Sequence, residues 1–96
     1  MLDISSLNIR RFDVKIEGQT ISLNPPKIKV LRKLINASKN DDIDEIIGCI
    51  VLIFNNNGNN KKFNDEWVED NLTYDEMTIL LKKYFEWVAE IQNNPN

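Results

Sequence analysis

The sequence contains no histidine and only one cysteine, Cys49. A lone cysteine excludes a disulfide within the chain, and the absence of histidine removes the most common general base and metal ligand. Cys49 falls on the apolar side of a predicted helix, so we interpret it as a buried structural thiol. The three glycines form no glycine-rich phosphate loop. The sequence therefore predicts no catalytic residue, no metal site and no cofactor; we expect a protein that is not an enzyme.

Long apolar runs are also missing. The longest, Ile46 to Phe54, is too short to span a bilayer. No basic leader followed by an apolar core opens the chain, so we expect a cytoplasmic protein that does not contact a membrane. With 96 residues, a single domain is expected. We divide it into an N-terminal arm (1–9), a β-hairpin (10–24), a helical part (25–92) with a polar loop (55–62), and a tail (93–96).

Two polar motifs suggest chemistry that their residues do not support. If Gly58 is placed at the sixth position of a calcium-binding EF-hand loop, the first and twelfth ligands become Ile53 and Asn64, and both essential carboxylates are missing. The loop is then interpreted as a flexible connection. The acidic pairs 65–66 and 69–70 flank Trp67 on a short predicted helix, where a solvated acidic face is the simpler interpretation than an acid–base pair.

The net charge of −3 is unevenly distributed. Residues 1–39 carry eight basic and three acidic side chains, whereas residues 40–96 carry four basic and twelve acidic ones. One explanation is intramolecular: the basic helix lies beside the acidic ones. The other is a head-to-tail contact between copies, which predicts self-association that weakens with salt. Nucleic-acid binding is not expected, because the second helix of the predicted helix pair opens with acidic residues that would repel phosphates.

The apolar periodicity changes after Leu23. Up to that residue apolar side chains alternate with polar ones, and a two-residue turn at Glu17-Gly18 would pair Val14 with Ile21 and Phe12 with Leu23. All of these apolar side chains then share one face of a β-hairpin. A lone hairpin is marginally stable in water, so helices are needed to cover that face.

Helical spacing follows the hairpin. We expect helices at about 26–37, from about 42 to 54, at about 64–70, and from Thr73 to about Gln92. Asn24 is the expected cap of the first helix, Asn40 or Asp41 that of the second, and Thr73 with Glu76 forms a capping box for the last. The second helix is expected to be central. The predicted inward stripes consist of Ile28, Leu31, Leu34 and Ile35; Ile43, Ile46, Ile47, Ile50, Val51 and Phe54; and Met77, Leu80, Leu81, Tyr84, Phe85, Val88 and Ile91.

The expected fold is therefore α+β and mainly α, with an N-terminal two-stranded hairpin packed on a bundle of three to four helices. Two interpretations remain open for the aromatic residues of the last helix. Trp87 is either peripheral core, with Ile79 as a harmless exposed residue, or part of a protein-binding edge with Tyr84 and Trp67, since Trp and Tyr dominate interface hot spots. The candidate partner-binding residues are Trp87, Tyr84, Trp67 and Ile79, together with Lys29 and Lys33 of the basic helix.

The order of these parts resembles the short tail assembly chaperones of long-tailed bacteriophages and of prophages of Gram-positive bacteria. The resemblance covers most of the chain and depends mainly on two stretches, N-P-P-K-I-K-V-L-R-K-L from Asn24 and L-T-Y-D-E-M-T from Leu72. It implies a non-enzymatic cytoplasmic protein that binds the tape measure protein during tail assembly, with the tail tube protein as a second candidate partner.

The resemblance also implies self-association, and a longer frameshifted form in some family members. It supplies no catalytic residues and no defined partner-binding positions. A different class of function stays open from the residues alone, namely a small acidic phage-encoded regulator or inhibitor that binds a host protein.

Overall fold

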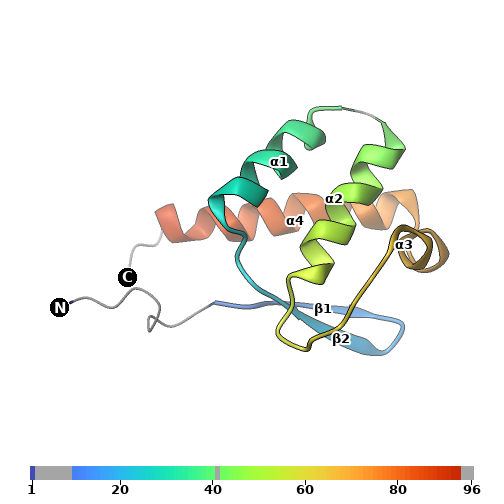
Figure 1. Cartoon of the computed structure of the whole chain (residues 1–96), viewed down its shortest axis with the longest axis horizontal. Helices are drawn as coiled ribbons and strands as arrows, with labels where there is room; N and C mark the ends of the chain where they lie inside the picture. Colours follow the sequence, from blue (N-terminus) through green and yellow to red (C-terminus); the bar gives the residue numbers. More distant parts are fainter. Residues whose placement is uncertain (2–9, 41, 94–96) are drawn as a thin grey trace.

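The computed structural model describes residues 1, 10–40 and 42–93. An antiparallel hairpin of β1 (Phe12–Ile16) and β2 (Gln19–Leu23) is followed by α1 (Ile28–Ser38), α2 (Ile43–Asn55), α3 (Asp65–Asn71) and α4 (Tyr74–Asn93). Figure 1 shows the hairpin at one side of the helices, with α2 between α1 and α3. The predicted α+β, mainly α fold class is confirmed. Most of the expected arm and tail lies outside the described residues.

The hairpin has the predicted register. Phe12 pairs with Leu23 and Val14 with Ile21. Glu17 and Gly18 form the turn with φ of 52° and 78°, and positive φ at both central residues is the requirement of a type I′ turn, whose twist matches that of the strands. Ile21 and Leu23 are fully buried, so the apolar face of the hairpin is covered by the helices, as expected.

The segment from Asn24 to Lys27 differs from the prediction. α1 begins at Ile28, and its N-cap, Lys27, makes no side-chain capping bond. The Asn24 side chain hydrogen bonds instead to Arg11 and Asn56. The reason is that a proline disfavours helical geometry in the residue before it, so Pro25 and Pro26 keep Asn24 and Pro25 extended and the helix starts after them.

α2 is the central helix, as predicted. Its cap is Asp42, whose carboxylate accepts a hydrogen bond of 2.9 Å from the Asp44 N–H; Asn40 is not the cap, and Asp41 lies outside the described residues. Ile53, outside the predicted stripe, is 1% exposed, which confirms that α2 is buried on more than one side. The buried residues of α2 are Ile46, Ile47, Cys49, Ile50, Ile53 and Phe54.

The predicted inward stripe of α1 is wrong on one side. Leu34 is fully buried and Val30 and Ala37 pack on the core, but Ile28 and Ile35 are 65% and 42% exposed. The face that meets α2 is therefore centred on Val30, Leu34 and Ala37. A single helix at the edge of a small domain contacts the core along a narrow strip, which leaves the flank of its apolar face in solvent. Ile43, predicted inward at the start of α2, is likewise 49% exposed.

The Asn-rich loop after α2 is held in place by its own side chains, so the prediction of a flexible connection is wrong. The Asn55 amide both donates to the Phe63 carbonyl and accepts from the Phe63 N–H, at 3.0 and 2.7 Å. Asn57 donates to the Phe54 and Lys61 carbonyls. Short amide side chains can replace backbone partners in turns, which explains why this segment is rich in asparagine.

Candidate partner-binding surfaces

The predicted aromatic edge on α4 lies in the core. Tyr84 is 1% exposed and Trp87 is 9% exposed. The ring of Phe12 on β1 lies 6.1 Å from that of Tyr84 and 5.4 Å from that of Trp87, between centroids. Arg10 covers the remaining side of Trp87, with its guanidinium carbon 4.6 Å from the ring centroid. Of the two interpretations left open, the structure therefore shows the core one for Trp87, Tyr84 lies in the predicted inward stripe, and neither residue is an exposed anchor.

Trp67 belongs to a second aromatic cluster. Its ring centroid lies 4.6 Å from that of Phe63 and 5.8 Å from that of Phe54. Phe63 is buried and Trp67 is half-buried. Phe63 was not assigned to the core from the sequence, because it stands alone in a polar segment without periodic neighbours. The cluster anchors the loop and α3 onto α2, so Trp67 has a structural contact that accounts for its presence.

Ile79 is the exposed member of the predicted aromatic and apolar set, with 59% of its surface in solvent. It lies in a groove of about 360 Å³ between β1 and α4. Leu80 and Lys83 line the α4 side of the same groove, and the residues of β1 line its other side. The structure therefore places Ile79 apart from Tyr84, Trp87 and Trp67 and next to the hairpin.

Lys29 and Lys33 are exposed on α1, as predicted. Lys29 lies beside the exposed isoleucines of α1, whereas Lys33 lies at the groove between α1 and α2. We define the α1 outer face as Ile28, Lys29, Leu31, Arg32 and Ile35. The structure shows two ion pairs among the described residues, Arg10–Glu90 and Lys83–Glu86. Neither includes a residue of α1, so within the described chain no direct ion pair supports the intramolecular explanation of the uneven charge.

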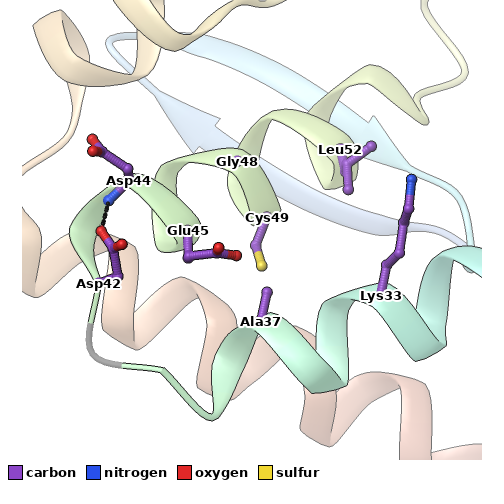
Figure 2. A pocket seen from close by; sticks show the side chains of 8 residues that line it. All are labelled: Lys33, Ala37, Asp42, Asp44, Glu45, Gly48, Cys49 and Leu52. Carbon is purple, nitrogen blue, oxygen red and sulfur yellow. Dashed lines mark hydrogen bonds between the residues drawn. The ribbon is translucent and has the colours of Figure 1, made fainter.

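A second groove, of about 390 Å³, separates the exposed sides of α1 and α2. Figure 2 shows Lys33 and Ala37 on one side and Glu45, Gly48 and Leu52 on the other, with the Cys49 thiol directed toward Ala37. Cys49 is 2% exposed. Burial, and secondarily the charge of Glu45, raises the pKa of this thiol. A protonated, covered thiol is a poor nucleophile, and the negative charge of Glu45 in the same groove favours the protonated form.

The described residues contain no group of three or more acidic or cysteine side chains placed to hold a metal ion. Among the helices of the described chain, none combines the length and the apolar character needed to cross a bilayer. The search of protein families, of curated proteins and of solved structures found no match to this chain. No relative therefore identifies a function, and the proposal below combines the exposed surfaces with the resemblance given in the sequence analysis.

The exposed pair Ile28 and Ile35 was missed as a surface feature by sequence reasoning. Their spacing of seven residues places both on one side of a helix, and this signal was correctly identified. Periodicity cannot show whether an apolar side meets the core or solvent, because both arrangements have the same pattern. Only the position of α1 at the edge of the domain separates the two.

Proposed function

We propose that this chain is a phage tail assembly chaperone, a non-enzymatic protein that binds a helical segment of the tape measure protein through the α1 outer face. The observation that carries the proposal is the exposure of Ile28 and Ile35, at 65% and 42%, on a helix whose cations are not paired within the described chain. Isolated exposed apolar residues are ordinary. Two large ones on the same side of one helix, with cations beside them, form a surface suited to another protein.

The arrangement matches one established mode of helix recognition. Amphipathic helices dock through anchors spaced at i, i+3 or i+4, and i+7. Ile28, Leu31 and Ile35 have this spacing, and Leu31 is half-buried between the two exposed isoleucines. Lys29 and Arg32 lie beside these anchors and favour an acidic partner segment. A long helical protein supplies amphipathic segments of this kind, and the resemblance described above supplies the tape measure protein as the candidate.

The gene neighbourhood is the first test. A tape measure gene directly downstream of the coding sequence is expected. Its absence would contradict the proposal and would favour the other class, a regulator or inhibitor that binds a host protein.

The second test measures binding of the encoded tape measure protein to the purified chain by calorimetry. Ile28→Glu with Ile35→Glu should weaken binding by more than about tenfold, since each anchor of an interface contributes about 1 kcal/mol or more. Ile79→Glu is the control for each single Ile→Glu change, because it places one negative charge on a similarly exposed isoleucine of α4. Unchanged binding by the α1 variant, with the same thermal stability as wild type, would overturn the assignment of this face.

A further inference from the structure

The two edges of the hairpin are not equivalent. With a two-residue turn, the hydrogen-bonded pairs are Ile16–Gln19, Val14–Ile21 and Phe12–Leu23. The backbone N–H and C=O groups of these residues point toward the partner strand. The N–H and C=O groups of the residues between them point away from it. On β2 the outward groups of Ser22 are used: the Gly58 N–H donates to the Ser22 carbonyl, and the Ser22 N–H donates to Asn59 Oδ1, at 2.9 and 3.1 Å. The Asn-rich loop therefore closes the β2 edge at Ser22, in the half of the strand farther from the turn.

The β1 edge is open within the part of the chain that the structure describes. By the same alternation, the N–H and C=O groups of Asp13 and Lys15 point away from β2. Among the residues that the structure describes, no hydrogen bond reaches these backbone groups. The groove that contains Ile79 lies directly beside this edge. An unpaired edge of this kind is a template for a further strand.

We propose that a second copy of this chain supplies that strand, so that two β1 strands pair antiparallel around a two-fold axis at Val14 and the two hairpins form one continuous sheet. In this register Asp13 lies opposite Lys15 of the second copy. Both residues have outward backbone groups, so each such pair exchanges both of its backbone hydrogen bonds. The contact is isologous and closes as a dimer.

The charges of β1 are complementary to themselves in this register. The two side chains on the solvent face of β1, Asp13 and Lys15, have opposite signs, and Arg11 and Glu17 flank the strand. Antiparallel pairing at Val14 places Asp13 of each copy opposite Lys15 of the other, so unlike charges meet at both of these positions. Directly opposed charges of unlike sign stabilise a strand pair, and like charges destabilise it.

The same charges exclude the neighbouring registers. A slip of two residues in one direction places Asp13 opposite Asp13 and Lys15 opposite Arg11. A slip in the other direction places Lys15 opposite Lys15 and Asp13 opposite Glu17. A slip of one residue turns the apolar face to solvent. Charges on an edge strand ordinarily prevent pairing, but this alternation repels most strands and accepts a copy of itself.

The apolar face continues across the proposed pair. Val14 lies opposite Val14, and Phe12 lies opposite Ile16 of the second copy. These side chains already face the core of their own chain, where Phe12 contacts Tyr84 and Trp87. The inference depends on β1 alone, so it stands apart from the tape measure proposal and its α1 outer face.

A charge exchange tests the pairing by analytical ultracentrifugation of the full-length protein. The wild-type protein should shift from monomer to dimer as its concentration is raised to the range used for NMR. Asp13→Lys and Lys15→Glu should each remain monomeric, because each brings like charges together. An equimolar mixture of the two variants should dimerise again, since the introduced lysine then opposes the introduced glutamate, and the native Lys15 of one variant opposes the native Asp13 of the other. Lys62→Glu, the same charge reversal on an exposed lysine of the loop after α2, is the matched control and should dimerise like wild type.

Amide hydrogen exchange gives a second readout that a general loss of stability would not reproduce. The Asp13 amide should be protected in the wild-type dimer and should exchange rapidly in the monomeric Lys15→Glu variant, while the Val14 amide stays protected in both. A monomeric wild type at all concentrations, single variants that dimerise like wild type, or a mixture that stays monomeric would each overturn the proposal. The variant with both α1 isoleucines replaced should still dimerise, which separates failure of this inference from failure of the proposed function.

Discussion

Arg10 and Trp87 make two contacts with each other, although they lie near opposite ends of the chain. The guanidinium carbon of Arg10 is 4.6 Å from the centroid of the Trp87 ring. Arg10 Nη1 also donates a hydrogen bond of 2.9 Å to the Trp87 carbonyl oxygen, and it lies 3.8 Å from Glu90 Oε2. The residue that leads into β1 is thereby attached to the C-terminal half of α4, and it covers an aromatic ring that would otherwise face solvent.

Replacing Arg10 with alanine should lower the free energy of unfolding by about 1–2 kcal/mol, because a cation–π contact and a charge-assisted hydrogen bond are lost together. Urea titration followed by Trp fluorescence measures this loss. Lys83→Ala is the control: it removes only an exposed pair with Glu86 on one helix, so its effect should be near zero. Equal effects of the two variants would mean that the Arg10 contact does not form in solution.

Phe12→Ala should destabilise the protein less than Phe54→Ala. Phe54 is fully buried, whereas Phe12 is half-buried on the hairpin. Truncation of a buried phenylalanine costs about 3–5 kcal/mol, and we expect about 2–3 kcal/mol for Phe12. Denaturant titration of both variants measures the difference. A Phe12 variant that loses less than about 1 kcal/mol would contradict the packing of β1 on α4.

The capping box at the start of α4 consists of two reciprocal hydrogen bonds, and it should stabilise the helix. Thr73 Oγ1 accepts from the Glu76 N–H at 3.1 Å, and Glu76 Oε1 accepts from the Thr73 N–H at 2.8 Å. Thr73→Ala should cost about 1 kcal/mol. Thr78→Ala is the control, because Thr78 follows the cap and its hydroxyl donates only to the Asp75 carbonyl. Thermal melts that show the larger loss for Thr78 would contradict the assigned cap.

Tyr84 should make the protein sensitive to alkali. Burial raises the pKa of Tyr84 from 10.0 to about 12. At a pH between these two values, the Tyr84 hydroxyl is mostly ionised in the unfolded chain and mostly protonated in the folded one. Ionisation stabilises the unfolded state, and stability therefore falls as the pH rises above about 10, by about 1 kcal/mol at pH 11.

Tyr84→Phe should reduce the loss at pH 11 by about 1 kcal/mol, the part due to Tyr84, and leave stability at pH 7 nearly unchanged; the Cys49 thiol, whose pKa is also raised, contributes a further part that remains. The measurement is the urea midpoint of each variant at pH 7 and at pH 11. Tyr74→Phe is the matched control, because Tyr74 is 48% exposed, and this variant should lose stability at pH 11 as wild type does. An equal loss in the Tyr84 variant would show that other groups control the alkaline transition.

Local features of this protein follow from the sequence. The hairpin register is set by strict alternation and by Gly18, which tolerates positive φ, so Phe12–Leu23 and Val14–Ile21 were correctly paired. The Thr73–Glu76 box is a contact between residues three apart. Such features depend on the geometry of a few consecutive residues, and neighbouring residues carry that information whatever the rest of the chain does.

Tertiary structure decided which apolar residues are surface and which are core. Of the two interpretations left open for Trp87, the structure shows the core one and not the exposed edge with Tyr84, whereas Ile28 and Ile35, predicted to face inward, lie in solvent. Periodicity defines an apolar side of a helix but not what covers it. β1, far away in sequence, covers Trp87, whereas no element of the described residues covers the flank of α1. The open edge of β1 is likewise visible only once the loop after α2 is seen to close β2, because the choice between two equivalent strand edges is made by long-range contacts.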